Sequence, residues 1–299
     1  MGGFKQWRAR ALLAGLAGLA MIPGMSRAAV NDLFPGDYYP LPAGSQSVAF
    51  YVYERGFTGP YTRGVKTGNA ELTSHVLALR YVRFFEAGGV RMAPVAVVNW
   101  ASTSATPAAW AAALGGHAAG LGDPRLGLTV WGLNDKEAGR FLGVTGMVIP
   151  PLGDYDGHRL LNIGENRWRY VLNGGFISRL GDDVFLDLLP EFVWYGVNDD
   201  YAGGRRLEQE PSHALTGYLR YRWNPQWQVH LGGQWNGGGA TVINGVGQNN
   251  PPENQRLMLG FTHLTDNKNQ WMLRLAADAA TENGYRAQRE LALRYVIAF

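Results

Sequence analysis

The carboxyl-terminal stretch of the chain alternates strictly between two kinds of residue. One set is apolar: Leu291, Leu293, Tyr295, Ile297 and Phe299. Because successive side chains of a β-strand point to opposite faces, this set would form one apolar face, and Glu290, Ala292, Arg294, Val296 and Ala298 would form the other. No run of 18 apolar residues follows position 28. If the chain spans a membrane, it must therefore do so as a closed barrel, in which every backbone group is paired between strands.

The amino-terminal 28 residues have the three parts of a secretory leader. Lys5, Arg8 and Arg10 make a positive start, residues 11–22 are an apolar run, and Ser26-Arg27-Ala28 is a small-x-small cleavage site. The apolar run is shorter than the roughly 20 residues that a membrane-spanning helix needs. We therefore predict a cleaved signal peptide at 1–28, a periplasmic N-terminal segment at 29–44 and a barrel at 45–299.

The charge balance changes when the leader is removed. The leader carries four basic residues and no acidic ones, so 23 basic and 24 acidic residues remain. The pI of about 9.1 thus belongs largely to the leader, and no nucleic-acid partner is predicted, since such a partner needs a basic patch on the mature surface. The chain has no cysteine, which excludes disulfides and thiol chemistry. No cofactor is predicted.

Twelve stretches of weakly alternating residues have about the length of barrel strands. The sequence predicts an all-β fold, a transmembrane antiparallel β-barrel of about 12 strands with short periplasmic turns and long extracellular loops. The predicted strands are 45–54, 72–85, 88–100, 123–133, 140–149, 166–179, 183–197, 212–223, 226–236, 254–265, 270–280 and 288–299.

The connections between these strands alternate in length. Long pieces follow the odd strands, such as 55–71 and 101–122, and tight ones follow the even strands, such as Gly181-Asp182 and Asn224-Pro225. This rhythm is typical of outer-membrane barrels whose two ends lie in the periplasm. A soluble lipocalin-like barrel or a sandwich would mimic the strand pattern without requiring the rhythm.

Aromatic residues gather near the predicted strand ends. On the predicted lipid face they suit the headgroup level of a membrane, although they would also fit the core of a soluble β-protein. These residues are Trp168, Tyr170, Trp194, Tyr221, Trp223, Trp227, Trp235 and Trp271.

The inward positions of the later strands carry seven arginines and four carboxylates. They would pair across strands and hold the wall together, or they would form a constriction that sorts polar or anionic solutes. Twelve strands lie between the eight that fill their own lumen and the 16 that leave it open. The predicted lumen-lining residues are Arg167, Arg169, Asp187, Glu191, Arg220, Arg222, Arg256, Arg274, Asp278, Glu290 and Arg294.

The long connection at 101–122 is almost apolar. Thr106 is a suitable N-cap, Pro107 a first helical residue and Gly115 a helix stop, so a helix of about eight residues is predicted. Such a helix needs burial. It would fold into the barrel mouth, where Trp110 and Leu114 would contact an apolar substrate, or it would pack against other loops.

The loop acids form two groups without the order of a calcium loop, so solvated acids are favoured over a Ca²⁺ site, and no metal is predicted. They are Asp154, Asp156 and Glu165, and Asp199 with Asp200.

A barrel-rim hydrolase would need a nucleophile beside a base. Ser212 with His213 and His263 with Thr265 are the nearest candidates, and neither pair lies in a catalytic motif. The glycines at 237–239 lack the lysine and helix of a phosphate loop. No catalytic residue is therefore predicted.

Several strings resemble one family. They are Gly122-Asp123-Pro124, Pro151-Leu152-Gly153-Asp154-Tyr155, Asn162 with Gly164, Asn166-Arg167-Trp168, and the terminal Phe299. Together they resemble the outer-membrane proteins grouped under the phenol meta-pathway name, over roughly residues 45–299. Position 152 departs from the pattern, which usually has threonine there. The resemblance implies a channel for aromatic or other hydrophobic compounds, and it implies no catalytic residue.

The leading hypothesis is a non-enzymatic channel in the outer membrane of a Gram-negative bacterium, which takes up small hydrophobic or aromatic solutes. Its expected partners are outer-membrane lipid and, through Phe299, the assembly machinery, because a terminal phenylalanine resembles the insertion signal of such proteins. A barrel-rim lipase or protease and a structural or adhesive barrel without transport are the alternatives.

Overall fold

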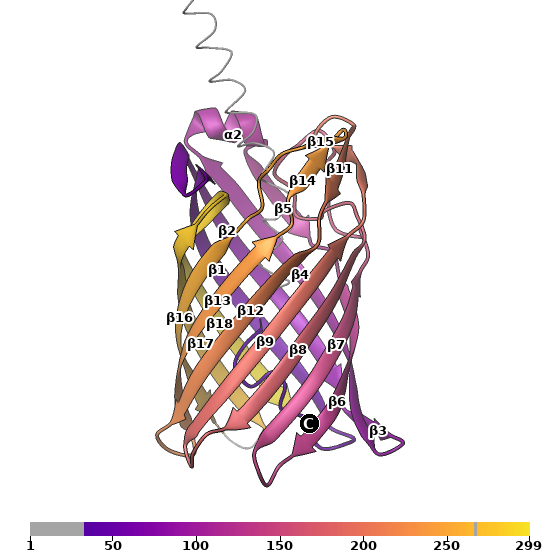
Figure 1. The fold of residues 1–299 in the computed structure, drawn as a ribbon, viewed down its shortest axis with the longest axis vertical. Coiled ribbons are helices and arrows are strands. Elements are labelled where there is room, and N and C mark those ends of the chain that lie inside the picture. The colour runs from indigo at the N-terminus through magenta and orange to yellow at the C-terminus, as the bar shows by residue number, and fades with distance from the viewer. Residues whose placement is uncertain (1–32, 266–267) are drawn as a thin grey trace, which may run out of the picture.

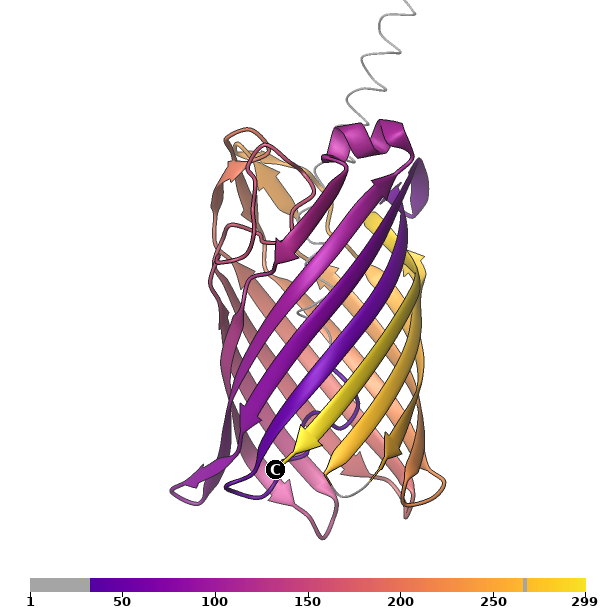
Figure 2. The same ribbon diagram turned by 180° about the vertical axis from the view of Figure 1, so that it is seen from behind.

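The chain folds into a closed antiparallel β-barrel of twelve strands (Figures 1 and 2). The computed structural model describes residues 33–265 and 268–299, so the predicted signal peptide lies outside the described residues. Pairing of β1 with β18 and of β2 with β4 closes the ring. The barrel strands are β1 (Gln46–Thr62), β2 (Val65–Arg83), β4 (Val90–Thr106), β6 (Arg125–Asp135), β7 (Arg140–Ile149), β8 (Arg169–Arg179), β9 (Val184–Tyr195), β12 (Ser212–Arg222), β13 (Trp227–Gly238), β16 (Asn254–Leu264), β17 (Asn269–Thr281) and β18 (Gly284–Ala298).

The alternation of the sequence sets which side chains face outward. In β18, Leu291 and Leu293 are exposed on the outer surface, whereas Glu290 and Ala292 are buried inside. The aromatic residues predicted on the outer face, from Trp168 to Trp271, are all 37% to 50% exposed. The alternative of a soluble protein with these rings in its core is therefore wrong for this barrel.

The first hairpin is longer than predicted. Residues 55–71, expected as a loop, belong mostly to β1 and β2, which meet at a two-residue turn. Arg63 and Gly64 make this turn with φ of 51° and 77°, the backbone that matches the twist of the flanking strands. Gly59 and Pro60 lie within β1 at an irregularity of the strand register.

The two ends of the barrel differ, as the lengths of the connections predicted. One end, here called the turn end, has the short turns, the short strand β3 (Phe85–Ala87) and the carboxyl terminus (Figure 1). The other, the loop end, has β5 (His117–Leu121), which pairs with β4, and a small sheet. That sheet contains β10 (Asn198–Tyr201), β11 (Arg205–Gln209), β14 (Thr241–Ile243) and β15 (Val246–Gly247).

A short helix, α2 (Ala108–Leu114), also lies at the loop end. Gly115 ends it in the left-handed region with φ of 95°, as predicted. The prediction of Thr106 as the N-cap is wrong, because Thr106 remains in β4, paired with Glu71, and Pro107 takes the cap position without a side-chain hydrogen bond. In the described part of the chain, no helix has both the length and the apolar character needed to cross a membrane.

The residues just before β1, here called the N-terminal segment (33–44), lie inside the barrel (Figures 1 and 2). Tyr38 donates or accepts a hydrogen bond with Thr145 of β7, and the Trp131 indole of β6 donates to the Tyr38 carbonyl. Further around the barrel, the Tyr218 hydroxyl of β12 donates to the Leu33 carbonyl, and across the lumen Arg294 of β18 pairs with Asp37. The described part of the segment expected in the periplasm therefore crosses the lumen and narrows it.

Candidate solute pathway

One side of the lumen is lined by a mostly apolar surface, here called the apolar wall. Its members alternate along β1, β2 and β4 on the inward face, and residues of β17, β18 and the loops join them. Each is less than 9% exposed, and together they pack as one cluster that ends at Phe34 of the N-terminal segment. The apolar wall consists of Ala49, Tyr51, Tyr53, Leu72, Val76, Ala101, Ala105, Leu114, Ala118, Leu161, Ile163, Met272 and Ala292.

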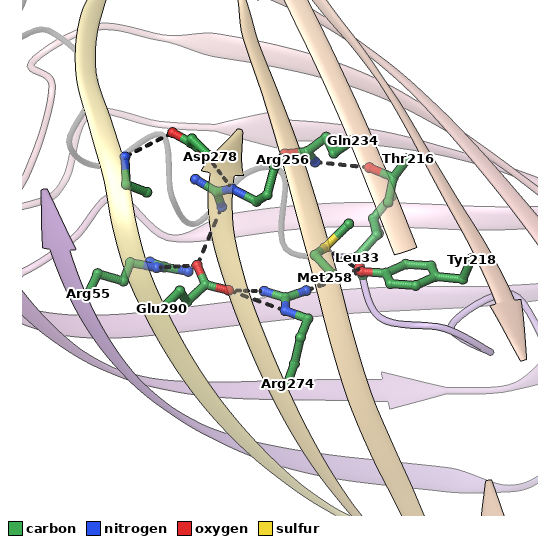
Figure 3. Close-up of polar contacts among 11 residues, drawn as sticks. Leu33, Arg55, Thr216, Tyr218, Gln234, Arg256, Met258, Arg274, Asp278 and Glu290 are labelled. Carbon is green, nitrogen blue, oxygen red and sulfur yellow. Dashed lines mark hydrogen bonds and ion pairs between the residues drawn. The ribbon is translucent and has the colours of Figure 1, made fainter. Parts of the chain in front are cut away.

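Beside this wall lies a group of buried charges centred on Glu290 (Figure 3). The Glu290 carboxylate accepts hydrogen bonds from Arg55 Nε at 2.8 Å and from Arg274 Nη2 at 2.7 Å. Arg256 links it to Asp278, with Nη1 3.4 Å from Glu290 and Nε 2.8 Å from Asp278. These five residues, here called the charged cluster, come from β1, β16, β17 and β18, so the ion pairs tie neighbouring strands together.

A second buried ion pair joins strands β9 and β12 of the barrel to the N-terminal segment. Arg220 of β12 donates to Asp187 of β9 through Nε at 3.0 Å and Nη2 at 2.8 Å. The other Asp187 oxygen accepts the backbone N–H of Gly36 at 2.6 Å. Both carboxylate oxygens therefore have donors, and one of the donors belongs to the segment that crosses the lumen.

At the loop end, a third group closes the connection between β7 and β8 onto the barrel. Asp123 accepts the backbone N–H groups of Gly153 at 2.9 Å and Glu165 at 3.0 Å. Glu165 in turn binds Arg167 at 2.6 Å and Arg169 at 2.7 Å. Burial raises the pKa of the Asp123 carboxyl above its usual value, although Arg169 and the two N–H groups oppose this shift.

These contacts give a physical role to the strings that resembled a family. Asp123 belongs to the first string and accepts the backbone N–H of Gly153 of the second. Asp154 accepts the backbone N–H of Leu121 through its carboxylate and donates its own backbone N–H to the Leu121 carbonyl. A Cβ on Gly164 would lie 2.9 Å from the Gly153 carbonyl carbon, so a side chain there would prevent this close approach. The strings therefore fix the loop that covers the loop end of the lumen.

The structure places nine of the eleven predicted lumen-lining residues in buried positions inside the barrel, and Arg256 is partly buried there, with its side chain 18% exposed. Arg222 differs, because it lies at the turn end with its side chain 39% exposed and pairs with Asp183. The acids of β9 were expected to pair with arginines of the neighbouring strands. Asp187 does so with Arg220, whereas Arg169 pairs with Glu165 and Asp123 instead.

Five charged residues of the lumen were not predicted from the sequence. Arg55 and Arg80 share the inward parity of Tyr53 and Val82. Arg80 lies within the predicted strand 72–85 and Arg55 directly follows 45–54, so reading the parity of these two strands as well would have found both. Asp37 lies in a segment that was expected outside the barrel, and Asp123 and Glu165 lie in loops. Strand parity carries no signal for these three acids.

The two predicted substrate-contact residues of α2 have different surroundings. Leu114 is fully buried in the apolar wall. Trp110 donates through its indole N–H to Asn69 at 2.6 Å and lies against Gly68 near the tip of the first hairpin. Leu114 therefore packs in the apolar wall, whereas Trp110 packs against the neighbouring hairpin.

The candidate catalytic pairs are not assembled into a site. Ser212 and His213 are adjacent on β12 and thus point to opposite faces of the barrel wall. The Ser212 hydroxyl is 2.7 Å from the Tyr195 hydroxyl, whereas the His213 ring lies 4.9 Å from the outward Trp235 ring. His263 stacks on Trp227 with ring centroids 4.3 Å apart.

The loop acids are engaged by protein groups in the described structure. Asp156 pairs with Arg159, and Asp199 pairs with Arg206. Within residues 33–265 and 268–299, no three histidine, cysteine or acidic side chains are grouped as metal ligands.

Comparison with known proteins gives a family match and related folds. A family model described as "Putative MetA-pathway of phenol degradation" matches residues 46–294. The COG4313 outer membrane channel from Pseudomonas putida F1 is 30% identical, with a TM-score of 0.85, and the match covers 90% of this chain and 100% of that one. The β domain of the Bordetella autotransporter BrkA is 12% identical with a TM-score of 0.57, covering 86% of this chain and 100% of that one, which shows similarity of fold alone. None of the curated proteins compared with the chain matches it.

Proposed function

The chain belongs to the phenol MetA-pathway family of outer-membrane channels, and from this premise we propose that it admits small hydrophobic or aromatic compounds. Its relatives are channels and not enzymes. The proposal concerns the class of solute, on which the family name and the barrel fold leave several possibilities.

The apolar wall is the observation that supports this class of solute. The lumen of a porin for hydrophilic solutes is polar and filled with water, whereas here tyrosine, leucine, valine and alanine side chains line one side from the loop end to Phe34. An apolar solute moving along this wall would contact mainly hydrocarbon and aromatic surface. Each Å² of apolar surface that it buries would contribute about 25 cal/mol.

The topology supports an orientation in the cell. We place the loop end outside the cell and the turn end, with both termini of the barrel, in the periplasm. The leader at 1–28 would direct secretion through the inner membrane. Phe299 exchanges backbone hydrogen bonds with Gln46 at 2.7 and 2.9 Å, so the residue that we expect the assembly machinery to recognise also closes the ring against β1.

Uptake of radiolabelled toluene tests the proposal. Because toluene dissolves in phospholipid vesicles, uptake is measured in intact Gram-negative cells that lack a channel of their own for it. Cells that produce this protein should take up toluene faster than cells with an empty vector. Val76→Asn should lower the rate about fivefold, since an amide on the apolar wall costs about 1 kcal/mol when an apolar solute desolvates it.

Thr216→Asn is the matched control, because Thr216 faces the same lumen from the polar side, where it accepts a hydrogen bond from Gln234. Its effect on toluene uptake should be small. Toluene uptake equal to that of the empty-vector cells, together with rapid swelling of proteoliposomes in arabinose, would show a hydrophilic pore and refute the proposal.

A further inference from the structure

A cavity of about 320 Å³ lies at the turn end between the N-terminal segment and the barrel wall. This volume is at the lower end of the range for small-molecule sites, about 300 to 1,000 Å³. Tyr51, Met272 and Ala49 belong both to its lining and to the apolar wall, so the wall continues into the cavity.

The charged lining of this cavity is mostly basic. Among its described lining residues, Asp37 is the one acid, against Arg80, Arg220, Arg294 and Lys268. Arg220 is already matched by Asp187, which lies behind it. The cavity thus has an apolar side and a side with excess positive charge, a combination that suits a solute with an apolar body and a carboxylate.

Arg80 lies on β2 and Arg294 on β18, the two strands next to β1, and both bind the Asp37 carboxylate. Arg80 Nη1 lies 3.2 Å from Asp37 Oδ2, and Arg294 Nη1 donates to Asp37 Oδ1. Arg294 Nη2 donates to Gln270 at 2.9 Å, and its Nε has no acceptor among the described residues. The barrel therefore supplies two cations, and the carboxylate that they bind comes from the N-terminal segment.

The same segment presents an aromatic ring beside this carboxylate. The Phe34 backbone N–H donates to Asp37 Oδ2 at 3.0 Å, which holds the two residues together. The Phe34 ring lies 5.7 Å from the Tyr51 ring and contacts the guanidinium groups of Arg274 and Arg294, at 4.2 and 4.8 Å from its centroid. Phe34 and Asp37 thus occupy the site as an aromatic acid would, with a ring on the apolar wall and a carboxylate on two arginines.

We propose that Arg80 and Arg294 form a carboxylate site for aromatic monocarboxylates, which Asp37 occupies until a solute displaces it. The inference rests on the proposed function and adds a preference within its substrate class, for apolar compounds that carry one acid group. Displacement of Asp37 releases one of the anchors of the N-terminal segment, so the solute that fits the site also loosens the segment that crosses the lumen.

Binding is measured by calorimetry on the folded protein in detergent micelles, with 3-phenylpropionate and its uncharged analogue 3-phenylpropan-1-ol as probes. The wild-type protein should bind the acid more tightly than the alcohol. Asp37→Asn should raise the affinity for the acid about tenfold, because the competing carboxylate is gone, and should leave the affinity for the alcohol unchanged. Arg294→Gln should remove the preference for the acid.

Arg222→Gln is the matched control, since Arg222 is an arginine at the turn end outside the cavity lining, and it should leave both affinities unchanged. In planar bilayers, the acid should raise the ion conductance of the wild-type protein and the alcohol should not. This conductance measurement uses only the wild-type protein, so it tests the proposal even if Asp37→Asn disturbs the N-terminal segment.

Equal affinity of the wild-type protein for acid and alcohol, or an unchanged preference in Arg294→Gln, would overturn the carboxylate site. In that case normal toluene uptake would leave the proposed function intact. Failure of toluene uptake together with absence of binding of both probes would refute both proposals.

Discussion

The apolar wall and the charged cluster lie side by side in one lumen, yet they are buried in different ways. The charges of the cluster are buried, apart from the partly exposed Arg256, and are matched by specific partners, as Glu290 is by Arg55, Arg256 and Arg274. The apolar wall has only packing contacts along most of its length. Loss of one partner should therefore damage the cluster far more than the wall, and the wall can exchange its contacts with the protein for contacts with a solute.

Removing the central acid of the charged cluster should have the largest effect. Glu290→Gln leaves three arginines near an uncharged amide, and breaking a buried ion pair costs about 3 to 5 kcal/mol of unfolding free energy. Urea unfolding in micelles, followed by heat-modifiable gel mobility, measures this loss. Glu54→Gln on β1 is the control, because Glu54 pairs with Arg289 at 3.4 Å with both side chains exposed, which is worth less than about 1 kcal/mol.

Equal unfolding free energies for Glu290→Gln and Glu54→Gln would break the comparison between the two inner surfaces. They would show that water reaches the charged cluster and screens it as it screens the outer pair.

An intermediate effect is expected where the apolar wall meets α2. Leu114→Ala removes a fully buried side chain and should cost about 2 to 3 kcal/mol. The loop should then be cleaved faster by added protease, and the ion conductance in planar bilayers should rise. Trp110→Ala should leave the conductance unchanged, because this ring lies against Gly68 and binds Asn69 near the hairpin tip and not in the lumen. A higher conductance in Trp110→Ala alone would reverse these roles.

The strand pattern of the sequence predicted most of the barrel because alternation is a local property. Parity placed Arg274, Glu290 and Arg294 on the inner face correctly, and it placed Leu291 and Leu293 on the outer face. It failed over 55–71, which was expected as a loop, because β1 and β2 continue to the turn at Arg63 and Gly64. Backbone pairing across the hairpin extends both strands beyond the stretches in which the alternation was recognised.

The N-terminal segment could not be predicted in the same way. Residues 33–44 have no strand alternation, and their position depends on partners far away in the sequence, such as Thr145, Asp187 and Arg294. Pattern reasoning also cannot say which arginine binds which acid. Arg169 was expected to pair within the wall, but it binds Asp123 and Glu165 because the loop between β7 and β8 folds back onto the barrel.

The smallest effect is expected where two hydroxyls interrupt the apolar wall. Ser74 of β2 and Thr103 of β4 face each other, and the Thr103 hydroxyl donates to Ser74 at 2.9 Å with both residues nearly buried. Thr103→Val alone should cost about 1 kcal/mol of unfolding free energy, because the buried Ser74 hydroxyl loses its partner. The double variant Ser74→Ala with Thr103→Val should be close to the wild type in stability, since replacing both partners by apolar groups can be nearly neutral.

The same double variant should also raise toluene uptake by no more than about twofold, because only a small polar area is removed from the apolar wall. A double variant that is much less stable than the single one would show that this pair belongs with the charged cluster, as a polar tie between strands, and not with the surface along which an apolar solute moves.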